Sequence, residues 1–157
     1  MKNMTLPAKS CSILLCALLL LAAGCKKEEP ETFISDKARP TWTAPEVSDM
    51  TSSMTAVIKV DLKAQYPDIA ADFVLDNNDL LAAFSGETCL GVAVPDDGLF
   101  YLYIGAPLNG NPSSITLRYY SAHYKNLFEA TDVFLYVSDS NQGSVDAPFL
   151  PAFVVMK

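Results

Sequence analysis

The sequence predicts an all-β protein, an antiparallel β-sandwich of immunoglobulin-like architecture with about six to eight strands. Short segments in which apolar and polar residues alternate run through the chain from residue 54 onward. Clusters of Gly, Pro, Asn, Asp and Ser separate these segments at regular intervals, as turns do. No long segment has the apolar spacing of an amphipathic helix, and no internal repeat is present, so residues 51–157 are predicted to form one domain.

The first strand is predicted from an alternating apolar series: Met54, Ala56, Ile58, Val60 and Leu62. Polar residues such as Thr55 and Lys59 fall between these positions, which places one face of the strand in the core and the other in water. Residues 63–79 are expected to form a long connection, with a helical turn starting at Pro67.

The remaining strands follow in order. Residues 80–85 and 88–94 flank Gly86 and predict a tight hairpin. The sequence PDDG at 95–98 predicts a turn into a strand at 99–104. After a loop, strands are predicted at 114–122, as one or two strands within 126–137, and, beyond a loop at 138–148, at 149–156.

The first 25 residues have the pattern of an export signal. Lys2 and Lys9 precede an apolar run, residues 12–21, which is too short to span the roughly 30 Å of a bilayer core as a helix but matches a secretory signal peptide. The sequence LAAGC at 21–25 resembles the lipobox of bacterial lipoproteins. That resemblance implies a diacylglycerol on the thiol of Cys25, cleavage before it, and a membrane anchor. The alternative for the apolar run is a buried helix.

These features predict three parts: a lipoprotein signal peptide at 1–24, the lipidated cysteine and a flexible tether at 25–50, and the sandwich at 51–157. Pro40 and Pro45 favour extended backbone in the tether, and Trp42 is expected to dock it onto the domain. In well-studied lipoproteins an aspartate after the lipidated cysteine favours the inner membrane, so Lys26 implies the outer membrane. The KKEEPE sequence resembles the acidic export signal of surface lipoproteins in Bacteroidota-type bacteria, which implies a domain facing the exterior; the alternative is a solvated tether.

Charge and cysteine content narrow the possible functions. The signal contains two of the 11 basic residues, so the mature chain retains nine against 18 acidic ones, a net charge of about −9. Such a surface repels phosphate backbones, so nucleic acid is not an expected partner, whereas neutral sugars or cations are compatible. Three of the four cysteines belong to the signal and the lipobox. Cys89 then has no partner for an internal disulfide and is expected to be a buried, inert thiol.

The hairpin and the strands after it resemble a module of secreted and surface lipoproteins of Bacteroidota-type bacteria, over about residues 41–153. Its pattern is an acidic residue, an Ala-Phe pair, a Gly-acidic turn, a cysteine and a Gly-Val-Ala, followed by a tyrosine-rich strand. The matching positions are Asp79, Ala83, Phe84, Gly86, Glu87, Cys89, Gly91, Val92 and Ala93. Leu90 departs from the pattern, which has a basic residue there. The resemblance implies a β-sandwich on an exported protein and no particular activity.

Catalytic and metal-binding groups are few. The single histidine, His123, lacks a second histidine for a zinc site. Glu87 and Glu129 could form the carboxylate pair of a glycoside hydrolase, but one lies in a turn and the other is expected to face solvent. No cofactor is expected, apart from a structural calcium ion that two oxygen-rich loops could hold, through Asp76, Asn78 and Asp79 or through Asp139, Asn141 and Asp146. Turns also favour these residue types.

Tyrosines supply the leading site hypothesis. If Phe100 faces the core, Tyr101 and Tyr103 share the solvent face of the same strand, where their rings could stack on sugars or dock on a protein. The ligand-binding residues are predicted to be Tyr101, Tyr103, Tyr119, Tyr120 and Tyr124. The alternative is ordinary cross-strand packing. The sequence thus predicts an outer-membrane lipoprotein with a non-catalytic binding or adhesion module for a glycan or protein ligand; the alternatives are a subunit of an envelope or surface assembly, and a hydrolase.

Overall fold

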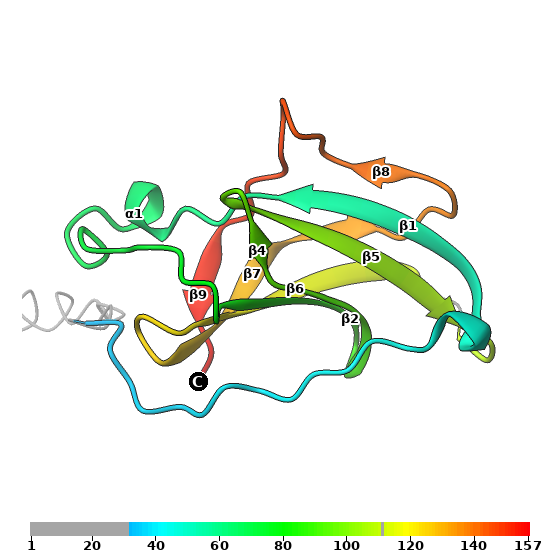
Figure 1. The fold of residues 1–157 in the computed structure, drawn as a ribbon, viewed down its shortest axis with the longest axis horizontal. Coiled ribbons are helices and arrows are strands. Elements are labelled where there is room, and N and C mark those ends of the chain that lie inside the picture. The colour runs from blue at the N-terminus through cyan, green and yellow to red at the C-terminus, as the bar shows by residue number, and fades with distance from the viewer. Residues whose placement is uncertain (1–31, 111) are drawn as a thin grey trace, which may run out of the picture. The chain divides into compact units, whose positions relative to one another are not determined.

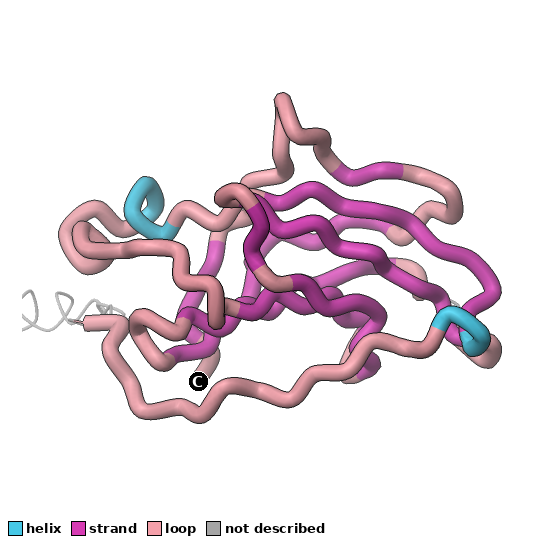
Figure 2. Tube along the Cα trace, in the orientation of Figure 1, coloured by secondary structure: helices cyan, strands magenta, loops and turns pink. Residues whose placement is uncertain are grey.

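The computed structural model describes residues 32–110 and 112–157 and confirms the all-β sandwich. The predicted signal peptide, Cys25 and the start of the predicted tether lie outside these residues. Strands dominate the described chain, and its two helical segments are short (Figure 2). The elements are η1 Val47–Asp49, β1 Met50–Ile58, α1 Leu62–Gln65, β2 Leu80–Ser85, β3 Thr88–Ala93, β4 Pro95–Asp96, β5 Leu99–Pro107, β6 Ser114–Ser121, β7 Asn126–Leu135, β8 Asn141–Gln142 and β9 Phe153–Val155.

The strands form two sheets (Figure 1). Sheet A has the order β4-β5-β1-β8, and sheet B has the order β3-β2-β6-β7-β9. All pairings are antiparallel except that of β1 with β8, which is parallel. The short strand β8 lies inside the segment predicted to be a loop. It was not predicted because its two residues show no alternation from which a strand could be inferred.

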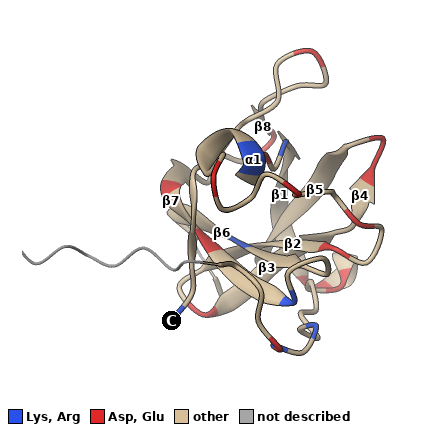
Figure 3. Cartoon of the chain, turned by 90° about the vertical axis from the view of Figure 1, so that its left-hand side faces the viewer, with Lys and Arg blue, Asp and Glu red and all other residues tan. Residues whose placement is uncertain are grey.

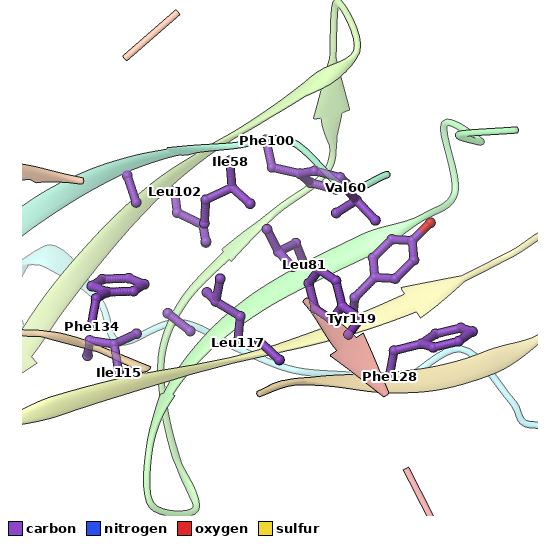
Figure 4. Packing of buried hydrophobic residues seen from close by; sticks show 14 of the residues in the cluster. Ile58, Val60, Leu81, Phe100, Leu102, Ile115, Leu117, Tyr119, Phe128 and Phe134 are labelled. Carbon is purple, nitrogen blue, oxygen red and sulfur yellow. The ribbon is translucent and has the colours of Figure 1, made fainter. Parts of the chain in front are cut away.

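The core lies between the two sheets (Figure 4). The alternating residues predicted to face the core of β1 and its continuation, from Met54 to Leu62, are all buried. On sheet B, Leu117 of β6 and Phe128 of β7 face the same core and are fully buried. The period-two pattern therefore identified the inner face of the strands correctly.

The tight turns follow from residues that accept positive φ. Gly86 has a φ of 58° in the two-residue turn between β2 and β3. Asp97 and Gly98, with φ values of 47° and 79°, form the turn between β4 and β5, as type I′ hairpins require. Both predicted turns are confirmed.

The structure adds detail to two local predictions. The predicted helical turn at Pro67 is present as a single turn, in which the Ala70 N–H donates to the Tyr66 carbonyl at 2.8 Å. A short helix that was not predicted precedes it: α1 begins after Asp61, whose carboxylate caps it by accepting from the Ala64 N–H at 2.9 Å. Residues 126–135 form one continuous strand, β7, where the sequence left one or two open.

An N-terminal strap, residues 32–49, packs against the sandwich and belongs to the same compact unit. Its anchor is Phe33, which is only 2 % exposed. The ring of Phe33 makes edge-to-face contacts, with centroid distances of 5.0, 5.8 and 5.2 Å, with Tyr66, Tyr124 and Phe128. Such contacts stabilise the packing of the strap beyond the favourable free energy of burying the ring itself.

Hydrogen bonds fix the strap at the turn between β6 and β7. The Ser35 N–H donates to the Tyr124 carbonyl at 2.8 Å, and the Asn126 side-chain amide donates to the Phe33 carbonyl at 2.9 Å. Asn126 is itself buried, so loss of the strap would leave its amide without this acceptor.

The strap covers the outer face of sheet B. Leu81 and Ala83 of β2 face the core, so Leu80, Ala82 and Phe84 face outward, yet these three are at most 5 % exposed. In Figure 1 the strap (light blue) runs along the sandwich beside β2. The reason is that β2 is apolar on both faces, and water can be excluded from the second face only by another layer of chain.

Two contacts place the strap on this face. The Trp42 and Phe84 rings meet edge to face at 5.6 Å, so the predicted docking of Trp42 is confirmed. The Tyr120 hydroxyl donates to the Lys37 carbonyl at 3.3 Å. The expectation of a flexible tether up to residue 50 is therefore wrong for residues 32–49, which form part of the folded unit.

Candidate binding face

Tyr101 and Tyr103 lie side by side on the outer face of β5, as predicted. Their side chains are 43 % and 48 % exposed, whereas Phe100, Leu102 and Ile104, on the opposite face of the strand, are buried. None of the described residues forms a hydrogen bond with either tyrosine hydroxyl, so both hydroxyls are available to a ligand.

The neighbours of these rings come from β1 and β8. Thr55 pairs with Tyr103 across the sheet, Val57 pairs with Tyr101, and Asn141 of β8 pairs with Thr55. The Thr55 hydroxyl is hydrogen-bonded to the Asn141 side-chain oxygen. We call Thr55, Val57, Tyr101, Tyr103 and Asn141 the tyrosine face.

Sequence reasoning missed three members of this face. Thr55 was assigned to the solvent side of β1, and Val57 was not assigned. Neither was connected with the tyrosines, because the pairing of β1 with β5 joins positions far apart in the chain. One signal was available: Val57 is an apolar residue in the polar register of its strand. Asn141 was considered only as a calcium ligand.

The backbone beneath Tyr103 is held by a close crossing of the two sheets. Gly91 of β3 lies so near to β5 that a Cβ added there would be 2.3 Å from the Tyr103 carbonyl oxygen. Only glycine allows this approach. The position of the tyrosine face is thus set by the packing of one sheet against the other.

The other three predicted ligand-binding tyrosines do not belong to the face. Tyr119, Tyr120 and Tyr124 are 0 %, 6 % and 1 % exposed. Each hydroxyl has an internal acceptor, and β6 is covered on one face by sheet A and on the other by the strap. Their prediction as ligand-binding residues is therefore wrong; they are packing residues.

Asp79 is the centre of a buried polar cluster. Its Oδ2 accepts from the Tyr119 hydroxyl at 2.6 Å and from the Asp76 N–H at 3.0 Å, and its Oδ1 accepts from the Ala122 N–H at 2.7 Å. Burial raises the pKa of Asp79 above its usual range, and the hydrogen bonds oppose that rise only in part. Burial and the adjacent Asp79 charge raise the pKa of Tyr119 as well. Through the hydrogen bonds from Tyr119 and Ala122, the carboxylate links the start of β2 to the end of β6.

His123 belongs to a second, exposed cluster. Its Nε2 lies 3.1 Å from Asp72 Oδ2, and the Tyr124 hydroxyl donates to Asp72 Oδ1 at 2.8 Å. The hydrogen bond from Tyr124, followed by that from His123, lowers the pKa of Asp72. The cluster ties the 66–79 connection to the β6–β7 turn.

The two glutamates considered as a hydrolytic pair share one arginine. Arg118 Nη1 and Nη2 donate to Glu87 at 3.1 and 2.9 Å, and Arg118 Nε donates to Glu129 at 3.1 Å. The Arg118 hydrogen bond and its charge lower the pKa of Glu87, whereas a general acid needs a raised one. The guanidinium also lies 4.4 Å from the Phe84 ring centroid, which joins this ion pair to the strap contact.

Several side-chain oxygens of the oxygen-rich loops accept hydrogen bonds from within the chain. Asp76 Oδ1 accepts from the Asn78 N–H at 2.7 Å and from its side-chain amide at 2.9 Å. Asp79 accepts the three hydrogen bonds given above, and Asp139 Oδ2 accepts from Ser138 at 3.1 Å. Within residues 32–110 and 112–157, no group of three or more His, Cys, Asp or Glu side chains is placed to hold a metal ion. Asp146 lies on an exposed loop.

The residues of the family resemblance have structural roles. Glu87 pairs with Arg118, Gly86 makes the turn, and Gly91 permits the crossing of the sheets. Leu90, where the module has a basic residue, is 1 % exposed and belongs to the core. Burial raises the pKa of the half-buried Cys89 thiol, which keeps it in the unreactive protonated form.

Comparisons of the chain with protein-family models, with curated protein sequences and with solved structures find no match. Among the described residues, no helix has the length and apolar character needed to cross a membrane.

Proposed function

We propose that the protein is an outer-membrane lipoprotein whose domain faces the cell exterior and acts as a non-catalytic binding module. The LAAGC and KKEEPE sequences support the anchor and its location. The observation that carries the binding role is the tyrosine face, a pair of exposed aromatic rings whose hydroxyls form no hydrogen bond with the described residues. Tyrosine provides a large contact area at little cost in conformational entropy, which suits it to recognition surfaces.

The groups considered for catalysis support a binding role over a hydrolase. Glu87 and Glu129 are both occupied by Arg118, and the lowered pKa of Glu87 favours the ionised form. His123 and Asp72 are engaged with Tyr124 in the turn that follows β6. Neither cluster adjoins the tyrosine face in the sheet pairing.

A second candidate function is that of a subunit in an envelope or surface assembly. One observation favours it: β9 pairs with β7 only along 128–130, so residues 132–135 have a strand neighbour on the β6 side alone within the described chain. Val133 and Leu135 of this open edge are 56 % and 70 % exposed. An open edge with apolar side chains can accept a strand from another chain.

Three measurements test the proposal on intact cells. Radiolabelled palmitate should enter the native chain and not Cys25→Ala. External protease should cleave the native domain while a periplasmic control protein survives; protection until lysis would place the domain in the periplasm. A benzophenone amino acid, which reacts with C–H bonds of proteins and sugars alike, should then be introduced at position 101 or at position 135. Adducts at 101 only support the binding face, and adducts at 135 only support the assembly subunit.

A further inference from the structure

We propose that the ligand of the tyrosine face is an uncharged polysaccharide, bound by stacking of Tyr101 and Tyr103 on the apolar faces of its sugar rings. This proposal rests on the binding role proposed above and adds the chemical class of the ligand. It follows from the charge, the composition and the rigidity of the face.

The face is uncharged in an acidic protein. Strands β1, β5 and β8 contain no Asp, Glu, Lys, Arg or His, although the chain has a formal net charge of −7. In Figure 3 the acidic residues colour loops and parts of β4 and β7, whereas β5 carries no charged residue. Charged residues border the face: Asp96 pairs with Leu99 in the next row of the sheet, Lys59 follows β1, and the Asp139 N–H donates to the Ser53 carbonyl of β1. A charged ligand would therefore find no side chain of opposite charge among the residues of the tyrosine face.

The composition of the face matches the chemistry of a sugar. A pyranose ring has an apolar face that stacks on an aromatic ring, and hydroxyls that need donors and acceptors at its rim. Residues at i and i+2 of a strand are about 6.8 Å apart, so two rings can serve neighbouring parts of one chain. Hydroxyl and amide groups for the rim are at hand in Thr55 and Asn141 and in the tyrosine hydroxyls themselves.

The limited apolar area favours a sugar over a protein partner. Val57 is the single aliphatic member of the tyrosine face, and its neighbours on the β1 and β8 strands are Ser, Thr and Asn. A protein partner gains most of its affinity from a central, fully desolvated apolar cluster. Such a cluster exists on this molecule at the outer face of sheet B, where the strap already covers it.

The rigidity of the face reduces the entropy lost on binding. Tyr103 belongs to a nine-residue strand paired with β1, and Gly91 of sheet B lies against its carbonyl. Binding would therefore order only side-chain torsions, two per tyrosine, and no loop.

The test is affinity electrophoresis of the full chain in polyoxyethylene-detergent micelles, which avoid sugar headgroups. Native gels should contain dextran, mannan, xylan or β-1,3-glucan as neutral polymers, and polygalacturonate or heparin as anionic ones. We expect at least one neutral polymer, and neither anionic one, to retard the protein. The retardation should be the same between 0.05 and 1 M NaCl, because no charge pairing is involved. Tyr101→Ala with Tyr103→Ala should weaken binding at least tenfold, and Tyr101→Phe with Tyr103→Phe should weaken it less, because the rings remain.

Val133→Ala with Leu135→Ala, on the other sheet, is the matched control and should bind normally. No retardation by any neutral polymer, retardation that the double alanine variant retains, or binding confined to anionic polymers would each overturn the proposal. Circular dichroism and the unfolding midpoint establish that each variant is folded. The benzophenone adduct at position 101 separates this proposal from the binding role. If the cross-linked partner is degraded by protease and resists periodate, it is a protein; the binding role then stands and the sugar ligand is refuted.

Discussion

The two outer faces of the sandwich differ in what their sequences require. On sheet B, β2 reads LLAAFS and is apolar on both sides, and its outer residues are buried beneath the strap. On sheet A, β5 reads LFYLYI in its first part, and its outer side consists of Leu99, Tyr101 and Tyr103, of which the two tyrosines remain exposed. Tyrosine tolerates water at its hydroxyl, whereas leucine and phenylalanine side chains gain about 1.5–3 kcal/mol when they are buried.

This difference separates structural aromatic residues from those available to a ligand. Phe33, Trp42 and Phe84 stabilise the contact between the strap and sheet B, so they are occupied within the chain. Tyr101 and Tyr103 contribute little to the core. Substitutions on the two faces should therefore separate stability from binding, and the predictions below are ordered by their expected effect on stability.

The largest effect is expected from Phe33→Ala. Removing a fully buried phenylalanine costs about 3–5 kcal/mol, because the apolar burial is lost and a cavity remains. Urea unfolding followed by tryptophan fluorescence should report this loss, since Trp42 lies in the same strap. The control is Ile34→Ala, the next residue, which is 69 % exposed and should change the free energy of unfolding by less than about 0.5 kcal/mol. Equal small losses for both variants would mean that the strap does not stabilise the domain.

Gly91→Ala should have the next largest effect. The new Cβ would lie 2.3 Å from the Tyr103 carbonyl oxygen, a backbone atom, so the two sheets must shift apart. Overpacking of this kind costs about 1–3 kcal/mol. Thr88→Ala, at an exposed position of the same strand, should cost less than about 1 kcal/mol. Thermal unfolding of both variants makes the comparison, and a stability of Gly91→Ala equal to that of the native chain would rule out the tight crossing.

Asp79→Asn should destabilise by about 1–3 kcal/mol, because the new amide N–H faces the Asp76 N–H donor. The effect should depend on pH. Burial raises the folded-state pKa of Asp79 above its ordinary value of 3.8, so the folded chain binds this proton more tightly than the unfolded chain. The contribution of the carboxyl to stability is then fully present below pH 3.8 and declines as pH rises through the folded-state pKa.

The measurement is the difference in unfolding free energy between the native chain and Asp79→Asn, taken from pH 3 to pH 8. Other titrating groups cancel in this difference. The native advantage should shrink as pH rises. An advantage that grows with pH would show that the three donors stabilise the charge by more than burial penalises it.

The smallest effects on stability are expected on the tyrosine face. Tyr101→Phe and Tyr103→Phe remove hydroxyls that have no hydrogen-bond partner within residues 32–110 and 112–157, and each should change stability by less than about 0.5 kcal/mol. Tyr119→Phe removes a donor to the buried Asp79 and should cost about 1–3 kcal/mol. Chemical unfolding of the three variants side by side tests whether exposed and buried tyrosines differ as described. Similar losses at all three positions would contradict the distinction.

Some of the fold could be predicted because local rules decide it. The alternation around Met54, the glycine at 86 and the PDDG turn each depend on residues adjacent in the chain. The exposure of Tyr101 and Tyr103 followed from the burial of Phe100 by the same alternation. The predictions failed for Tyr119 and Tyr120, because alternation cannot identify a strand that is covered on both sides. They failed for Tyr124 because this turn residue packs against Phe33 and Phe73, which are distant in the chain.

The continuous apolar run of β2 was a signal of the missing layer. A strand with no polar face needs a cover on each side, and the strap supplies the outer cover through Trp42, which packs on Phe84. The buried role of Asp79 had no comparable signal, since its three donors come from a tyrosine, a loop amide and its own turn.

The sequence by itself determined the strand class, the turns and the inner face of most strands, because the two-residue period and positive φ are properties of short segments. The tertiary structure decided which aromatic residues are free, since that depends on strands brought together from distant parts of the chain. Thr55, Val57 and Asn141 join the tyrosines only when β1 pairs with β5 and β8. The strap buries aromatic residues on the outer face of sheet B for the same reason, since the burial of a face depends on what packs against it.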